Sequence, residues 1–386
     1  MTSKTRLLVL VVSAPIIAFA VIGGFLGSAI ARDDTYQQLR IFQDVVNLII
    51  NSYVEAADLK KVMSGAMRGI TEGLDPDSAY LVPDEVKRLE AGATPPTGET
   101  GLEITRQYYL RIVSARDNSP AARAGLRPGD LIRIIDQTPT RDLSAFEGVR
   151  RLRGTPGSKV TLTVIRGNQA DPHVVELTRE VLTTSDVRSR LQAPGVGYVR
   201  LGAFSRRAAA QLKTQVADLA RQGATSLVID LRGTASGEYD EAIGAARLFV
   251  SSGTLAVRQA RGTENQTISA AAGDGSITMP VALLTDIGTS GPAEVFAAAL
   301  DANKRADLIG ERTLGRVTVQ KLVKLPDGSG LWLTGSRYLL PSGKPLQGLE
   351  PDVAVEQPDL EFGEALPTSD ETLQKAIERL TQKRAA

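Results

Sequence analysis

The hydrophobic and polar positions of the chain fall into segments with different periods. Residues 7–30 form a predominantly apolar run of 24 residues, long enough as a helix to cross a hydrocarbon core of about 30 Å. Lys4 and Arg6 precede the run, and positive charge before a span keeps that end in the cytoplasm. The run therefore predicts a membrane-targeting segment, with the rest of the chain on the outer side.

Cleavage of this segment stays open. Ala29-Ile30-Ala31 fits the small-x-small pattern of a cleavage site. The apolar run is longer than the core of an ordinary signal peptide, which spans about 7–15 residues. An uncleaved signal anchor is therefore favoured over a removed signal peptide.

Apolar residues then recur at intervals of three and four over residues 39–53 and again over 59–70. This spacing predicts two amphipathic helices, the second of which ends near Gly73 and Pro76. Short amphipathic helices bury little apolar surface alone. We therefore expect them to pack on each other, on a later domain, or across a homodimer. Residues 93–98, rich in threonine and proline, predict a linker.

The next part of the chain, ending near Arg179, has short β-rich runs separated by turns and one helix over 144–152, which predicts a compact β-rich module. The remainder alternates strands and helices, which favours a largely parallel sheet with helices on its faces. The predicted strands of the module are 102–104, 110–113, 131–135 and 159–165. The later strands are 197–201, 226–231 and 281–285, and the helices are 206–222, 239–250 and 292–302.

The composition excludes several kinds of chemistry. The chain has no cysteine and one histidine, His173, in a stretch that predicts a surface turn. Thiol nucleophiles, disulfides and cysteine or multi-histidine metal sites are therefore excluded, and we expect no metal and no cofactor. The 45 basic residues nearly balance the 44 acidic ones, so the chain lacks the basic excess that binds nucleic acid.

Ordered motifs spread over residues 74–353 give the chain a family resemblance. It resembles the carboxy-terminal processing, or tail-specific, serine peptidases of bacterial envelopes and chloroplasts, which carry a PDZ domain. Residues 74–81 match the LDPHSxYL element of that family, with Asp77 in place of the histidine. The other matching segments are 119–130 and 152–160 in the PDZ-like part, and 227–232, 309–315 and 348–353 in the peptidase-like part.

The resemblance implies a multidomain fold, partly β-rich and partly α/β, in the bacterial periplasm or on the outer face of the inner membrane. The implied parts are a signal anchor or signal peptide (1–31), an N-terminal helical segment (32–93), a PDZ-like domain (98–182), a peptidase-like α/β core (183–360) and a C-terminal helical tail (361–386).

The PDZ-like part has the features that bind a protein C-terminus. A loop that presents backbone N–H groups can hold a terminal carboxylate, and the edge of the following strand can accept an extended peptide. We therefore expect apolar C-terminal tails as ligands. The candidates are Thr100, Gly101 and Leu102 in the loop, Glu103 and Ile104 in the strand, and Phe146, Val149 and Arg150 in the facing helix. Phe146 and Val149 are equally compatible with the core of the module.

The catalytic positions depart from the family pattern. In active relatives a serine lies three residues before a glutamate, and a lysine 25 residues later serves as its base. Counted from Glu294, these positions hold Gly291 and Arg316, whereas the supporting glutamine is present as Gln320. A serine hydroxyl needs a neutral neighbouring amine to accept its proton. Arginine stays charged and cannot do this.

Other residues offer partial replacements. Ser290 could act as the nucleophile only after a one-residue shift, which turns a side chain by about 100° near a helix start. Lys321 is the nearest other amine, but in a strand it would face away from Gln320. The loop over residues 230–237 differs in shape from the family's oxyanion loop, although Ser236 and Gly237 still offer backbone N–H groups.

We therefore expect an extracytoplasmic homologue of these peptidases that binds C-terminal tails and does not cleave them. One alternative is an active serine-type endopeptidase that uses Ser290 and Gln320 with an unidentified base. A membrane-anchored PDZ scaffold is the other alternative. It differs from the expected tail-binding homologue only in its partner.

Overall fold

The computed structural model describes residues 36–91, 97–167, 171–182, 186–358, 360–364 and 367–385. The predicted membrane segment, residues 7–30, and its cleavage site lie outside these ranges. Within them, no helix is both long and apolar enough to cross a membrane. The chain divides into two compact units, Met1–Met67 and Arg68–Ala386.

The two predicted N-terminal helices are present. The first spans residues 36–52, and the second, α2, is Leu59–Glu72. In the first helix Phe42, Val46 and Ile49 are half-buried, whereas Leu39 at the start of the predicted stripe is exposed. Beyond α2 come the short strand β1 (Ala79–Leu81) and the helix α3 (Pro83–Glu90).

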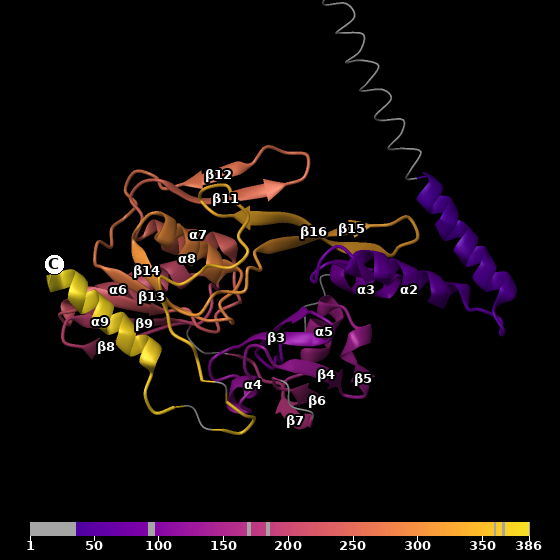
Figure 1. Cartoon of the computed structure of the whole chain (residues 1–386), viewed down its shortest axis with the longest axis horizontal. Helices are drawn as coiled ribbons and strands as arrows, with labels where there is room; N and C mark the ends of the chain where they lie inside the picture. The colour runs from indigo at the N-terminus through magenta and orange to yellow at the C-terminus, as the bar shows by residue number, and fades with distance from the viewer. Residues whose placement is uncertain are drawn as a thin grey trace, which may run out of the picture. The chain divides into compact units, whose positions relative to one another are not determined.

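The predicted β-rich module is a six-stranded antiparallel sheet in the order β2-β3-β4-β6-β7, with β5 paired to β4 (Figure 1). Its core is made of side chains that alternate inward along the strands, such as Ile104, Ile112, Ile132 and Leu162, all fully buried. The elements are β2 (Leu102–Arg106), β3 (Leu110–Ala115), α4 (Pro120–Arg123), β4 (Leu131–Ile135), β5 (Thr138–Pro139), the 3-10 helix η1 (Thr140–Asp142), α5 (Ala145–Leu152), β6 (Lys159–Ile165) and β7 (His173–Thr178).

His173 corrects the expectation of a surface turn. It is the first residue of β7 and is only partly exposed. Its ring stacks on Phe362 with the centroids 4.4 Å apart, so the C-terminal segment of the chain packs against this module.

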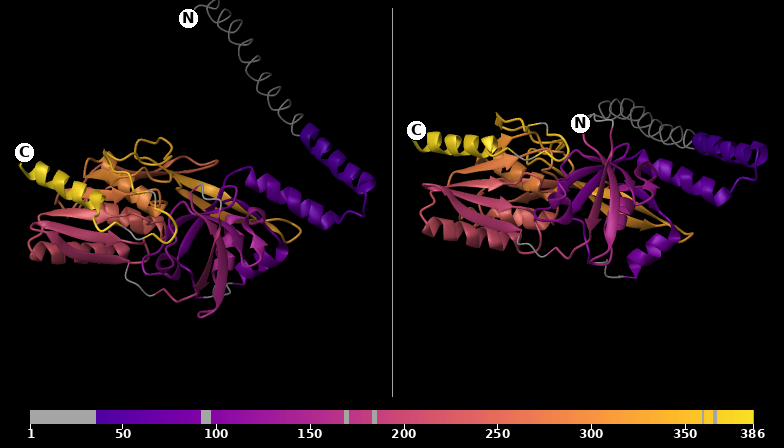
Figure 2. Two further views of the ribbon diagram at one scale, coloured as in Figure 1. Left: turned by 60° about the horizontal axis from the view of Figure 1, so that its bottom comes forward. Right: turned by 90° about the horizontal axis from the view of Figure 1, so that it is seen from below.

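The predicted parallel sheet is also present, in the order β17-β14-β13-β10-β9-β8, with only β8 antiparallel to its neighbour. Its central strands are buried on both faces and read as continuous apolar runs. Helices α6, α7 and α8 cover one face and α9 covers the other (Figure 2). The elements are β8 (Val187–Ala193), β9 (Val196–Leu201), α6 (Ala208–Arg221), β10 (Ser226–Asp230), α7 (Tyr239–Arg247), β13 (Val281–Thr285), α8 (Pro292–Ala302), β14 (Ala306–Gly310), β17 (Val353–Ala354) and α9 (Glu371–Ala385).

A third sheet, which the sequence pattern did not predict, positions the candidate site. Its order is β1-β16-β11-β12, and β15 also pairs with β16. Because Ala79 pairs with Trp332, the segment before β1 lies beside the residues that lead into β15. The strands are β11 (Thr254–Ala260), β12 (Gln266–Ser269), β15 (Thr318–Lys324) and β16 (Gly330–Leu339).

Candidate active site and peptide groove

The turn from β13 into α8 places Gly291 at the start of the helix. Gly291 is the N-cap, with φ +60° and ψ −121°, and Pro292 is the first helical residue. Proline is pre-organised for this position, whereas the left-handed φ of residue 291 suits glycine. Glu294 accepts a hydrogen bond from the Gly291 N–H at 3.1 Å, which is the glutamate half of a capping box; glycine has no side chain for the other half.

A side chain at position 291 would have room. A Cβ built there lies 3.4 Å from the Ala235 carbonyl oxygen, 3.6 Å from the Arg316 carbonyl oxygen and 3.7 Å from the Tyr239 hydroxyl. These are ordinary contacts, so the obstacle to another residue is the positive φ and not the space. Backbone strain of this kind costs of order 1–3 kcal/mol.

Glu294 connects this turn to the segment that leads into β15. Its buried carboxylate also accepts hydrogen bonds from the Thr313 hydroxyl at 2.5 Å, the Gly315 N–H at 2.5 Å and the Arg316 N–H at 2.9 Å. Burial raises the pKa of Glu294, and these hydrogen bonds oppose that rise. A glutamate three residues after the helix start is the sequence signal that could have identified this structural role of Glu294.

Arg316 binds Asp77, a residue far away in the sequence. The Arg316 Nη2 lies 2.7 Å from Oδ1 of Asp77, and the Nε lies 2.9 Å from both carboxylate oxygens. Burial alone would lower the pKa of Arg316, but the hydrogen bond and the charge of Asp77 reverse this effect and raise it. Arg316 is therefore a fixed cation whose guanidinium is committed to a carboxylate.

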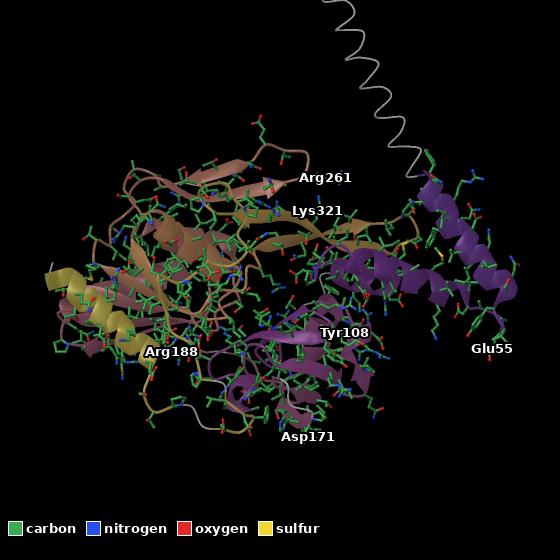
Figure 3. All side chains as sticks on the ribbon, in the orientation of Figure 1. Glu55, Tyr108, Asp171, Arg188, Arg261 and Lys321 are labelled. Carbon is green, nitrogen blue, oxygen red and sulfur yellow. The ribbon has the colours of Figure 1, made fainter. Side chains whose placement is uncertain are left out.

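Gln320 reaches this pair through a threonine. Its Nε2 donates to the Thr318 hydroxyl at 2.9 Å, and that hydroxyl donates to Asp77 at 3.2 Å. Lys321, labelled in Figure 3, is exposed, and its aliphatic stem lies against Gly335 of β16. The predicted separation of Lys321 from Gln320 agrees with these contacts.

Ser290 is fully buried. Its backbone N–H donates to the Thr234 carbonyl at 3.0 Å. Among the described residues, its hydroxyl oxygen has no hydrogen-bond partner. A general base has to be within such a distance of the proton that it removes.

The loop after β10 is fixed to the chain near Phe204. The Phe204 N–H donates to the Ser236 carbonyl at 2.9 Å, and the Glu238 N–H donates back to the Phe204 carbonyl at 2.8 Å. A Cβ on Gly237 would lie 2.4 Å from the Phe204 backbone, so only glycine fits this close approach.

A pocket of about 290 Å³ joins this loop to the β-rich module. On one side it is lined by Thr100, Gly101, Leu102 and Glu103 of the predicted carboxylate loop and strand, and on the other side by the predicted oxyanion loop. Gly101 has φ +82°, and a Cβ there would collide with Ser119. The lining residues of the oxyanion loop are Ser236 and Gly237. The other lining residues are Arg116, Val149, Leu152, Arg153, Leu182, Ala203 and Ser205.

The predicted groove residues of β2 and α5 have different surroundings. Val149 of α5 lines the pocket, whereas Ile104 of β2 is buried in the core of the module. Phe146 lies outside the pocket, with its ring 5.5 Å from that of Trp332. Arg150 is directed to Glu85, at 4.0 Å. These two side chains lie on the face of α5 that meets the segment around β1 and α3, so neither lines this pocket, and their role in a peptide groove stays a prediction.

Charged groups surround the pocket. Arg116 forms an ion pair with Asp186 at 2.5 Å, and Arg153 forms one with Glu99 at 3.1 Å. Burial raises the pKa of Glu103, and the charges of Arg316 and Arg153 oppose this rise. Neither pocket arginine was predicted from the sequence, since nothing in the local pattern distinguishes Arg116 and Arg153 from other surface arginines.

Comparison with known proteins assigns the chain to a family. A family model described as Peptidase family S41 matches residues 195–355, and a PDZ domain model matches residues 111–166. The carboxy-terminal-processing protease of Bartonella bacilliformis is 30% identical over 335 residues, which cover 85% of this chain and 77% of that protein. The chain belongs to peptidase family S41.

Other S41 relatives agree with this assignment. The carboxyl-terminal-processing protease of Synechocystis sp. is 33% identical over 316 residues, which cover 80% of this chain and 74% of that protein. The solved structure of a photosystem II D1 C-terminal processing protease matches with a TM-score of 0.69 at 26% identity, covering 87% of this chain and 96% of that chain. The similarity to S41 proteins therefore extends over the PDZ domain as well as the core.

The S41 match includes the α8 turn and the segment that leads into β15. Gly291, Glu294, Arg316 and Gln320 all lie within residues 195–355. Asp77, which binds Arg316, lies outside that range, in the segment before β1. The charge that fixes Arg316 thus comes from outside the S41 core.

Proposed function

We propose that this S41 member is an extracytoplasmic protein that binds protein C-termini and does not cleave them. The observation that carries the proposal is the ion pair between Arg316 and Asp77. By resemblance these positions hold lysine and histidine in active relatives. The two departures compensate each other, because the permanent positive charge of Arg316 forms an ion pair with the negative charge of Asp77.

Three features oppose peptide hydrolysis. Position 291, where the resemblance expects the nucleophile, has no side chain. Arg316 keeps its proton, so it cannot accept one from a serine. The loop atom nearest to a side chain at 291 is the Ala235 carbonyl oxygen, an acceptor, which cannot serve as a hydrogen-bond donor to an oxyanion.

Ser290 does not restore the missing nucleophile. Its hydroxyl is buried and makes no hydrogen bond to a base in the described part of the chain. A neutral serine hydroxyl is a weak nucleophile without such a partner.

Peptide binding is supported by the pocket between the PDZ domain and the core. A C-terminal carboxylate would meet the backbone N–H groups of the loop at Gly101 and the positive charge of Arg116 and Arg153. Upstream residues of the same peptide would extend along β2, which is the terminal strand of its sheet. An apolar side chain near the terminus would contact Val149 and Leu152.

The test is incubation of the purified full chain with a fluorescent peptide that ends in apolar residues. We expect saturable binding by fluorescence anisotropy, with a preference for the free carboxylate over the amide, and an intact peptide by mass spectrometry. Ser290→Ala is the matched control and should behave as the parent chain. Cleavage that disappears in Ser290→Ala would establish an active peptidase instead.

The proposed location is supported by residues 7–30 and by the basic residues before them. A C-terminal fusion to alkaline phosphatase, which folds only in an oxidising compartment, should be active. The same fusion lacking residues 1–31 should be inactive. Activity of both fusions, or of neither, would contradict a location set by this segment.

A further inference from the structure

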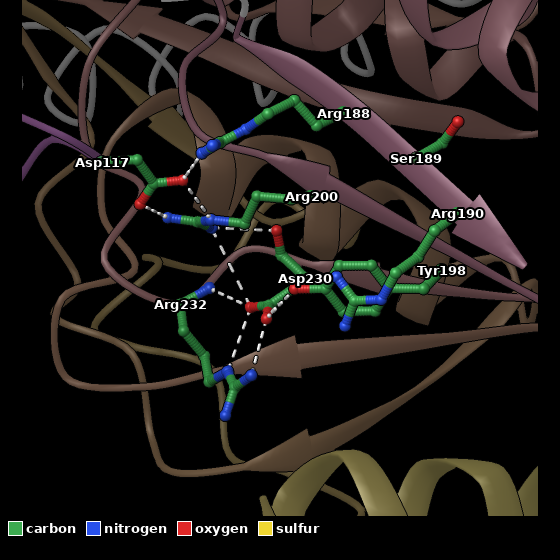
Figure 4. Close-up of a pocket in the computed structure, with 8 residues that line it drawn as sticks. All are labelled: Asp117, Arg188, Ser189, Arg190, Tyr198, Arg200, Asp230 and Arg232. Carbon is green, nitrogen blue, oxygen red and sulfur yellow. Dashed lines mark hydrogen bonds and ion pairs between the residues drawn. The ribbon is translucent and has the colours of Figure 1, made fainter. Parts of the chain in front are cut away.

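A second pocket, of about 430 Å³, lies on the face of the parallel sheet that carries α9, near the edge formed by β8 (Figure 4). It shares Asp230 and Arg232 with the start of the 230–237 loop and contains no residue that lines the peptide groove. Its size is that of a small-molecule site. Its lining is strongly charged, with four arginines and two aspartates.

The arginines come together because of strand register. Arg188 and Arg190 are two residues apart on β8, so both project from the same face of the sheet. On β9 they lie directly opposite Arg200 and Tyr198. Arg188 and Arg200 are therefore a cross-strand pair of like charges, which is destabilising without a counter-charge.

Asp117 of the PDZ domain supplies that counter-charge. Its carboxylate accepts hydrogen bonds from Arg200 at 2.9 and 3.0 Å and from Arg188 at 2.5 Å. Figure 4 shows this carboxylate bridging the two guanidinium groups. The pocket therefore already holds one anionic group, which is part of the chain.

The charges of the pocket do not balance. Its four arginines face the carboxylates of Asp117 and Asp230 and that of Asp370, which binds Arg232 from outside the pocket, so one positive charge is left over. Arg190 carries this excess. It lies over the Tyr198 ring at 4.1 Å and donates to the Gln192 amide oxygen. Within the described ranges it pairs with no carboxylate.

We propose that this pocket binds a small phosphate-bearing ligand through Arg188 and Arg190. The planar fork of arginine matches phosphate oxygens with two parallel hydrogen bonds. The Cα atoms of alternate residues on one strand lie about 7 Å apart, and the long arginine side chains let both guanidinium groups reach one phosphate group. The Tyr198 ring holds the Arg190 guanidinium in place.

The ligand competes with Asp117 for Arg188. A phosphate bound to Arg188 replaces the hydrogen bond that Asp117 makes with it. Removal of the Asp117 charge therefore strengthens phosphate binding, whereas removal of the Arg190 charge weakens it. These opposite effects distinguish the pocket from a general attraction of anions to the surface.

The experiment is calorimetric titration of the purified full chain with glycerol 3-phosphate at constant ionic strength. We expect saturable binding that Arg190→Gln weakens by about tenfold or more, because a charge-assisted hydrogen bond is lost. Asp117→Asn should bind more tightly than the parent chain. Arg261→Gln, which removes the same charge from an exposed position elsewhere in the core, is the matched control and should leave the affinity unchanged.

No saturable binding, or equal affinities in the parent chain and Arg190→Gln, would overturn the proposal. A second arm uses dihexanoylphosphatidylglycerol below its micelle concentration to identify the source of the phosphate. Tighter binding of this lipid than of glycerol 3-phosphate supports a lipid headgroup as the natural ligand, and the reverse order supports a soluble phosphate compound. In both arms, a cooperative unfolding transition verifies that each variant is folded.

Discussion

Arg316 and Asp77 are 239 positions apart in the sequence and form a two-point ion pair. The pairing of β1 with β16 brings them together, because it fixes the preceding segment beside the entry to β15. Asp77 is 7% exposed and the Arg316 side chain is 29% exposed, so the pair is partly shielded from solvent. Each residue is a departure from the family pattern, and each supplies the charge that the other needs.

The first prediction concerns the stability that this pair provides. Asp77→Ala and Arg316→Ala should each lower the free energy of unfolding by about 3 kcal/mol, because each leaves a shielded charge without its partner. The double variant should lose less than the sum of the two. Denaturant unfolding measures all three, and the exposed pair Lys324–Glu90 is the control, since Lys324→Ala should cost less than about 1 kcal/mol. Additive losses at 77 and 316 would show that the ion pair is not coupled.

The second prediction concerns restored catalysis. Gly291→Ser with Arg316→Lys should not cleave peptides while Asp77 remains, because the carboxylate would favour the charged lysine and raise its pKa. Adding Asp77→His removes that charge, and we expect this triple variant to show measurable hydrolysis. The serine has room at position 291. The assay is release of the tail from a reporter protein, and equal cleavage by the double and triple variants would contradict the inhibitory role of Asp77.

The parts of the fold that the sequence predicted are those with a strong local signal. Residues 227–229 and 281–284 are uninterrupted apolar runs, as expected of strands buried on both faces. The strand β12 was missed because it is largely exposed and polar (Gln266–Ser269), and β15 was missed because it is only half-buried and mixes polar with apolar residues. Their order comes from pairing with distant strands, which no local pattern reveals.

The candidate site was predicted only in part, because some of its contacts join segments that are far apart in the sequence. The positions 291 and 316 follow from motif counting, whereas the partner of Arg316 depends on a tertiary contact. Phe146 and Arg150 were assigned to the groove from their place on a helix, but the segment around β1 covers that side of α5. The side of a helix that meets a distant segment is set by packing, which helical periodicity alone does not specify.

The third prediction concerns the pH dependence of peptide binding. Glu103 lines the peptide pocket, and burial raises its pKa above the ordinary value of 4.5. As the pH falls from 7 toward this raised pKa, Glu103 takes up a proton and its repulsion of a peptide carboxylate weakens. The terminal carboxylate itself stays ionised to about pH 3.5. Affinity for a tail peptide should therefore rise on mild acidification.

Fluorescence anisotropy between pH 7 and 5 measures this effect. Glu103→Gln has no titrating group at this position, so its affinity should be higher at pH 7 and should change little with pH. Glu176→Gln, at an exposed position of β7 outside the pocket, is the control and should keep the parent profile. The same pH dependence in Glu103→Gln and the parent chain would assign the effect to another group.

The final prediction concerns Glu294, which holds the α8 turn and the 313–316 segment together. Glu294→Ala removes the acceptor of four hydrogen bonds in a buried site, and a buried donor without a partner costs about 1–3 kcal/mol. We expect the free energy of unfolding to fall by at least about 4 kcal/mol, with faster hydrogen exchange at Gly315 and Arg316. Glu294→Gln keeps one oxygen acceptor and should lose clearly less. If the alanine variant exchanged these amides at the parent rate, the carboxylate would not be what holds the segment.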